Sequence, residues 1–213
     1  MDYTSQMTAL LSELRRERNG EAADSMRFYG NGCGLNLGVA IHTIRSIAGQ
    51  FPHDHEFAVY LYRQDVRELR IAALWLAEPH RVMPDSFSFW ESGIINSEIA
   101  EQAAMALFKG VECADELIER WSRSDNALVA YAALLTAARN ERCCAESAIA
   151  AAEAIVARFE DNRLVGQGAV AALSALYMRS ADAVRQSAER ISKNITPTAR
   201  FVSEELSWRL AVD

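Results

Sequence analysis

The sequence has little of what a strand-rich, membrane-spanning or disulfide-bonded protein requires. Its 213 residues include only 4 prolines and 4 cysteines, and no segment alternates apolar and polar residues as a half-buried strand does. No apolar run approaches the roughly 20 residues that cross a bilayer. The N-terminus is amphipathic and charged, which is unlike a signal peptide. We therefore expect a cytoplasmic protein that does not contact a membrane.

The cysteines are not arranged for metal binding or for disulfides. Cys143 and Cys144 are adjacent, Cys33 and Cys113 are isolated, and no C-x-x-C pair occurs. Such spacing does not suggest zinc or a redox dithiol. We expect buried free thiols.

Two motifs that look like ligand sites do not fit their chemistry. Residues 30–38 contain four glycines, but Leu35 occupies the critical glycine position of a dinucleotide-binding loop and no lysine follows. We expect a connection into a helix around residues 39–48. In His53-Asp54-His55 the two imidazoles would point apart on a helix, and no third ligand lies nearby. No G-x-S-x-G elbow is present. We expect neither a metal nor a cofactor.

Positive charge comes almost entirely from arginine, with 20 arginines against 2 lysines and a net charge of −7. This balance argues against indiscriminate nucleic-acid binding, because phosphate neutralisation needs concentrated positive charge. A guanidinium can nevertheless hold a phosphate or a carboxylate through two parallel hydrogen bonds. Either the arginines pair with nearby Glu and Asp along solvated helix faces, or some of them line a binding surface.

Apolar residues recur at three-and-four spacing along almost the whole chain, which predicts an all-α protein. Five segments share a loose pattern of small and aliphatic residues, at the interval of about 30 to 40 residues typical of HEAT-like helix pairs. They begin at Val66, Ser97, Asn126, Leu164 and Thr198. Alanines at the shared positions would let neighbouring helices approach closely. We predict a single HEAT-like repeat domain, an α-α superhelix, over residues 1–213.

Residue types at helix starts and the tryptophans refine this prediction. Asn96-Ser97, Ser124-Asp125 and Thr196-Pro197 are typical of helix N-termini. The four tryptophans have roughly repeat-like spacing, which favours packing between repeats for Trp75, Trp90, Trp121 and Trp208. Trp90, in SFSFWESG, has a second interpretation, as an aromatic edge facing a groove.

Residues 19–79, from NGEAADSMRFYG to LYRQDVRELRIAALWLAEP, and the following FWESGIINSEIAEQAAMALF resemble the DNA alkylation repair family of HEAT-like repeat proteins. The resemblance implies a C-shaped solenoid whose concave face cradles duplex DNA. It also implies cleavage of the glycosidic bond of purines alkylated on a ring nitrogen. A carboxylate and electron-rich aromatic rings would stabilise the positively charged, oxocarbenium-like sugar, and active members also use an arginine on the concave face.

The family's functional residues carry over only in part. Its tryptophan, and the aspartate four residues later, fall on Ser97 and Glu101, so that one carboxylate remains. Its arginine falls on Val129 and Ala130, and a later aromatic position falls near Ala171. The resemblance therefore implies Glu101 as the catalytic group.

Other residues could support a ligand on the same face. Trp90 or Tyr131 would supply aromatic contacts, and Arg45, Arg67 and Arg70 would bind the ligand if they gather on the concave side. Two hypotheses follow. The first is a DNA repair protein that binds alkylated duplex DNA and excises the base. The second is a non-catalytic repeat scaffold that binds a protein or peptide. The net negative charge and the missing family residues favour it.

Overall fold

The computed structural model describes residues 2–29 and 34–210. In these residues every regular element is a helix, and β structure is limited to one isolated parallel bridge between Leu35 and Val66. This confirms the all-α prediction. Across the described residues, no helix combines the length and the apolar character that crossing a membrane would need.

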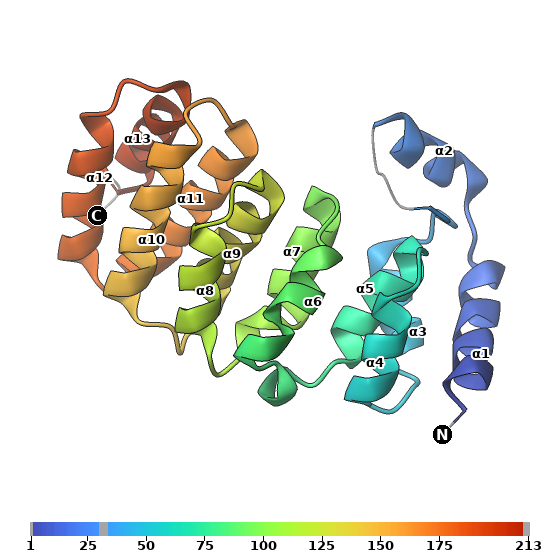
Figure 1. Ribbon diagram of the computed structural model, residues 1–213. Coiled ribbons are helices and arrows are strands. Elements are labelled where there is room, and N and C mark those ends of the chain that lie inside the picture. Colours follow the sequence, from blue (N-terminus) through green and yellow to red (C-terminus); the bar gives the residue numbers. More distant parts are fainter. Residues whose placement is uncertain (1, 30–33, 211–213) are drawn as a thin grey trace.

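The helices form two layers (Figure 1). The inner layer consists of six helices, each packed on the next: α3 (Ile41–Ala48), α5 (Arg67–Leu76), α7 (Ser97–Ala106), α9 (Ala127–Arg139), α11 (Arg163–Tyr177) and α13 (Pro197–Leu210). The outer layer contains α4 (His55–Tyr62), α6 (Phe87–Ser92), α8 (Ala114–Ser122), α10 (Ala145–Arg158) and α12 (Ala181–Ser192). Helices α1 (Tyr3–Arg16) and α2 (Gly20–Phe28) precede them, and 3-10 turns cover Pro79–Arg81, Pro84–Ser86 and Phe108–Gly110. Helices of the two layers alternate along the chain, as expected for helix-pair repeats.

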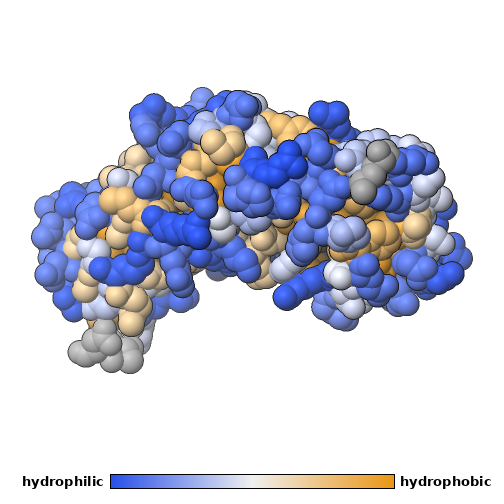
Figure 2. Space-filling view, turned by 90° about the horizontal axis from the view of Figure 1, so that it is seen from below, coloured by the Kyte–Doolittle hydropathy of each residue, from blue (hydrophilic) through white to orange (hydrophobic). Residues whose placement is uncertain are grey.

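The molecule is an arch. In Figure 1 α8 and α10 lie in front of α9 and α11, and Figure 2 shows the same molecule from below with a hollow along its lower edge. That edge corresponds to the back of Figure 1, where the inner layer lies. The inner layer therefore forms the concave face.

Side-chain caps start most of the inner helices. Asn96 accepts from the backbone N–H of Ile99, and Asn162 accepts from that of Val165. Thr196 caps α13 ahead of Pro197, as predicted, by accepting from the backbone N–H of Ala199 at 3.3 Å. The cap of α9 is Asn126, one position after the predicted Ser124-Asp125. Each such cap contributes about 1 kcal/mol.

Small residues bring the inner helices close together. Most alanines of α7 and α9 are buried. On α11, a Cβ at Gly168 would lie 2.7 Å from Cδ2 of Tyr131, and one at Gly166 would lie 2.7 Å from Cδ1 of Phe201. These two glycines let α11 pack directly against the rings of α9 and α13.

Arg67 is buried at the start of α5, with no exposed surface. Its Nε and Nη2 donate to the Glu98 carboxylate at 2.7 and 2.6 Å, and its Nη1 donates to Glu68 at 2.8 Å and to the Val39 carbonyl at 2.9 Å. Burial alone would lower the pKa of this guanidinium, but the bonds and charges of Glu98 and Glu68 outweigh it and raise the pKa. Arg67 thus ties the segment before α3 to α5 and α7. The expectation that it lies on a ligand-binding surface is wrong.

For Trp90 the structure confirms packing and contradicts the groove-facing interpretation, whereas Trp208 differs from expectation. Trp90 is fully buried, with ring centroids 4.9 Å from Tyr62 and 5.1 Å from Phe89, so it is a core residue and offers no ring to a groove. Trp208 is 77% exposed, although its spacing favoured packing. The reason is helical geometry, because Leu206 faces the core and a residue two positions later points to the other side of α13.

The glycine-containing segment connects α2 to α3. Residues 30–33, including Cys33 and the first glycines of the motif, lie outside the described residues. The remainder pairs with the chain before α5, since Leu35 donates to Asp65 and accepts from Arg67 through the backbone. Helix α3 begins at Ile41, close to the predicted start. Of the three described cysteines, all free, Cys143 is buried, Cys113 is half-buried and Cys144 is exposed, so burial was predicted correctly for one.

Candidate nucleic-acid interface on the inner layer

A carboxylate and a phenol meet at the middle of the inner layer. The hydroxyl of Tyr131 on α9 donates to Oε1 of Glu101 on α7 at 3.1 Å. Desolvation, followed by the charge and hydrogen bond of Glu101, raises the pKa of Tyr131 to about 12. Tyr131 therefore keeps its proton near neutral pH and remains a donor. The fold brings Glu101 into contact with Tyr131, which the sequence analysis had chosen as aromatic support.

The remaining family positions offer little to this centre. Val129 and Ala130 are buried in α9, so the place expected for an arginine belongs to the core. Ser97 lies one turn before Glu101 on α7, and Ala171 is half-buried on α11. Met105, one turn after Glu101, is 41% exposed. Glu101 is therefore the only one of these family positions that carries an ionisable group.

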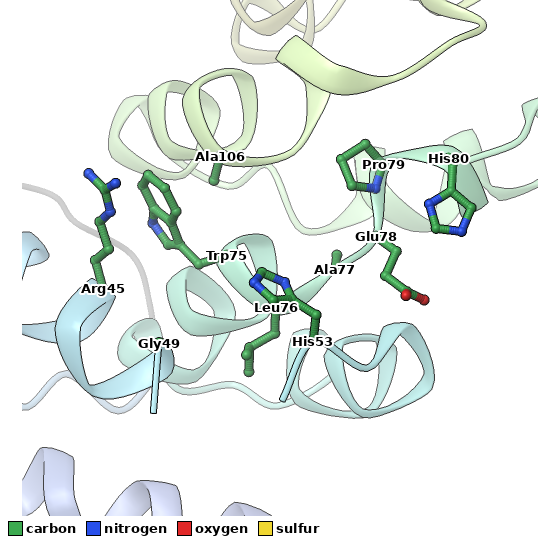
Figure 3. Close-up of a pocket in the computed structure, with 10 residues that line it drawn as sticks. All are labelled: Arg45, Gly49, His53, Trp75, Leu76, Ala77, Glu78, Pro79, His80 and Ala106. Atoms are coloured by element: carbon green, nitrogen blue, oxygen red, sulfur yellow. The ribbon is translucent and has the colours of Figure 1, made fainter. Parts of the chain in front are cut away.

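A cation stacked on an indole lies on one side of this centre. The guanidinium carbon of Arg45 on α3 is 4.4 Å from the ring centroid of Trp75 on α5. Figure 3 shows the guanidinium beside the indole, with Ala106 on the other side of the ring. Arg45 is exposed and forms no ion pair with any described residue. Its N–H groups are therefore available to an anion.

Two hollows adjoin this pair. One has a volume of about 820 Å³ and is lined by residues of α3 together with Trp75, Gln102 and Met105. The other, of about 580 Å³, shares Arg45 and Trp75 and extends toward Glu78 and His80 (Figure 3). The larger hollow is lined by α3, the turn after it, α5 and α7, with no outer-layer residue, so it opens on the inner layer.

A second cation–ring pair lies on the other side of the Glu101–Tyr131 pair. The guanidinium carbon of Arg163 on α11 is 5.3 Å from the ring centroid of Phe201 on α13. Both residues line a hollow of about 260 Å³ that also includes Ala171. The inner layer therefore carries an arginine–aromatic pair near each end and a carboxylate in the middle.

The other arginines selected from the sequence do not reach this surface in the same way. Arg70 pairs with Asp65 at 3.3 Å and donates to the Gln64 carbonyl at 3.0 Å. Many further arginines pair with acids, as in the first interpretation of the arginine content; these are Arg16, Arg27, Arg81, Arg123, Arg142, Arg185, Arg190 and Arg209. Of the three predicted ligand-binding arginines, only Arg45 stands unpaired beside an inner hollow.

Sequence analysis missed Trp75 as a surface residue and missed Gln102, Arg163 and Phe201 altogether. The repeat interval could have identified which of these residues meet on adjacent helices. The partners Glu101 and Tyr131 are 30 positions apart, and Arg45 and Trp75 have the same spacing. Residues on adjacent inner helices meet when they are separated by about one repeat of 30 to 40 residues.

Metal chemistry has no support from the described part of the chain, where no group of three His, Cys, Asp or Glu side chains converges. Asp54 caps α4 by accepting from the Phe57 N–H. His55 is buried, with its ring 5.8 Å from Trp90.

This architecture, a two-layered helical repeat with a concave inner groove, defines the class of the protein. The family model for "DNA alkylation repair enzyme" matches residues 10–201, and the chain belongs to that family. One solved structure is similar to this chain. The match covers 99% of this chain and 94% of the other chain, with 16% sequence identity and a TM-score of 0.73. That structure is described as "a new family of proteins related to the HEAT-like repeat DNA glycosylases with affinity for branched DNA structures". The search of curated proteins gives no match.

Proposed function

We propose that this protein binds DNA along its inner layer, with Arg45 and Arg163 holding phosphates on either side of Glu101. The observation that carries the proposal is the order of the three pairs on successive inner helices. Arg45–Trp75 joins α3 and α5, Glu101–Tyr131 joins α7 and α9, and Arg163–Phe201 joins α11 and α13. Cations flank a carboxylate, as an anionic backbone around a reacting or distorted nucleotide would require.

The net charge of −7 sets a condition on this binding. Most of the acidic side chains must lie away from the surface that contacts DNA, because each phosphate contact needs a nearby cation. Arg45 meets the condition because no acid of the described chain pairs with it, and stacking on an aromatic ring leaves a guanidinium's N–H edge free for phosphate. Family membership supports DNA as the ligand, and so does the affinity for branched DNA described for the structural relative.

Base excision is the second part of the proposal, and Glu101 carries it. An alkylated purine is already a cationic leaving group, so the enzyme mainly has to stabilise the developing positive charge on the sugar and position water. A half-buried carboxylate fixed by a phenol is suited to both tasks, because it needs little reorganisation when that charge appears. Loss of this activity alone would leave a DNA-binding protein.

The test combines binding and chemistry. Anisotropy of a fluorescein-labelled duplex, with and without methylated purines, would be titrated at two salt concentrations. We expect the Arg45→Gln/Arg163→Gln variant to lose affinity and to reduce the slope of log K against log salt by about 2, at roughly 0.9 for each lost phosphate contact. Arg123→Gln, which removes an exposed, ion-paired arginine from the outer layer, is the matched control.

Release of free purine from methylated duplex would be measured with the wild type and with Glu101→Gln. Release that disappears in the variant, with binding unchanged, would support excision. Binding without release would restrict the function to DNA association. Absence of both, with no salt-dependent binding, would overturn the proposal and favour the protein- or peptide-binding scaffold.

A further inference from the structure

The larger hollow beside Trp75 is an open depression in the inner layer that brings together three kinds of recognition group. It combines an indole, a stacked guanidinium and an amide within about 820 Å³. The amide belongs to Gln102, which is only 5% exposed. These groups come from three successive inner helices, α3, α5 and α7, and no outer helix contributes to the lining.

Gln102 carries the strongest signal. Its Oε1 is buried and has no hydrogen-bond partner among the described residues, although buried amide oxygens are almost always satisfied. The indole N–H of Trp75 is also buried without an acceptor. Leaving such groups unpaired destabilises the free protein. Both atoms are enclosed by protein, but their residues line the hollow, so a ligand bound there would pair with the Gln102 oxygen once the amide turns toward it.

The shape of the polar and aromatic groups indicates a flat ligand. An indole ring supplies a stacking surface, and a side-chain amide can both donate to and accept from the edge of a heteroaromatic ring. The cation already stacked on Trp75 shows that a planar group fits against the indole at 4.4 Å. Arg45 is exposed and has no ion pair among the described residues, so it can leave the indole and meet a phosphate instead.

We infer that this hollow binds an unpaired nucleotide of DNA. Its base would stack on Trp75 in place of the guanidinium, the Gln102 amide would contact the base edge, and Arg45 would hold the adjoining phosphate. The inference rests on the proposed function, because it takes DNA as the ligand of the inner layer. It adds that the protein distinguishes DNA with an unpaired base from a fully paired duplex.

The experiment compares three fluorescein-labelled probes, which are a paired duplex, the same duplex with one unpaired nucleotide, and a short single strand. We expect tighter binding of the probes that have an unpaired base, with quenching of tryptophan fluorescence. Trp75→Ala should reduce that preference by about five- to a hundredfold, the loss expected for one base–aromatic stack, and Trp75→Phe should retain most of it. Trp208→Phe is the control for an exposed tryptophan distant in sequence from the hollow.

Gln102→Met provides a readout independent of folding. It keeps the side-chain length and removes an oxygen that has no partner in the free protein, so the melting temperature should stay level or rise while the preference for an unpaired base falls. A lower melting temperature with an unchanged preference would overturn the inference.

The probes separate the two proposals. Equal binding of the paired and unpaired probes would overturn the nucleotide pocket and leave DNA binding intact. Binding of the single strand alone would overturn duplex association and leave the pocket. Binding of no probe would overturn both.

Discussion

Tyr131 and Glu101 are joined across α7 and α9 by a 3.1 Å hydrogen bond at the centre of the concave layer. The contact is possible because Gly168 on α11 leaves room for the phenol ring, whose Cδ2 would otherwise lie 2.7 Å from a Cβ. Three consecutive inner helices therefore fix the position of one carboxylate. Substitutions that shift any of these three helices should therefore displace the Glu101 carboxylate.

Gly168→Ala should disturb this centre. The added methyl would meet Tyr131 at 2.7 Å and Leu134 at 3.1 Å, so we expect destabilisation of about 1–3 kcal/mol, typical of overpacking, despite the better helix propensity of alanine. Urea denaturation measures it. Gly20→Ala, where nothing lies within 4 Å of the new methyl, should be neutral or stabilising. Equal effects at both positions would show that packing around Tyr131 is loose.

The stability of the protein should fall at alkaline pH in a manner that depends on Tyr131. Its pKa is raised from the ordinary 10.0 to about 12 by desolvation and by Glu101. Its contribution is complete below pH 10 and is lost as pH rises through 12. Chemical denaturation between pH 9 and pH 12 should show a steeper decline for the wild type than for Tyr131→Phe. Parallel declines would contradict the coupling.

His55 should make the protein sensitive to mild acid. Burial, and then the charge of Arg81, lowers the pKa of this imidazole, whose Nδ1 accepts from the Glu78 N–H. A folded-state pKa below the unfolded value of 6.5 means that the contribution is present above pH 6.5 and is lost as pH falls through the folded pKa.

The comparison for His55 is with His55→Gln, which keeps an acceptor and does not titrate. Thermal unfolding from pH 7 down to pH 5 should show a larger loss of melting temperature for the wild type than for the variant. A variant that loses as much would place the acid sensitivity elsewhere.

Removal of the buried cation Arg67 should cost far more than removal of a surface arginine. Arg67→Met leaves the buried Glu68 with its backbone donors but without its cationic partner, and breaking such a pair costs about 3–5 kcal/mol. Arg142→Met, which breaks an exposed pair with Glu112, should cost less than about 1 kcal/mol.

A double variant sharpens this test. Arg67→Met/Glu68→Gln removes both buried charges and should recover part of the loss seen in Arg67→Met, as measured by denaturation. If the double variant were less stable by the sum of two independent effects, Arg67 would not act mainly by neutralising Glu68.

The architecture was predictable because helix periodicity and repeat spacing are local properties of a sequence. The position of Arg67 was not. A charged residue in the first turn of an amphipathic helix resembles a solvated one, and its burial depends on Glu98, which is 31 positions away. The prediction for Trp208 was wrong in the opposite direction. Its spacing favoured packing, but the rotation of α13 points its side chain toward solvent.

The functional surface was partly predictable. Family likeness selected Glu101, and Tyr131 was chosen as aromatic support, but the hydrogen bond between them depends on the rotation of both helices. Gln102 was not selected as a site residue from the sequence. Its unpaired oxygen becomes visible only when the neighbours of every buried atom are known.

The three pairs of the inner layer do not lie at the same height along their helices. Arg45 and Trp75 are in the last turns of α3 and α5, Glu101 is near the middle of α7, and Arg163 is the first residue of α11. Inner helices run in the same direction, because an outer segment returns the chain between them. A line through the pairs is thus oblique to the helix axes, and a duplex following it would enter and leave the arch over opposite rims.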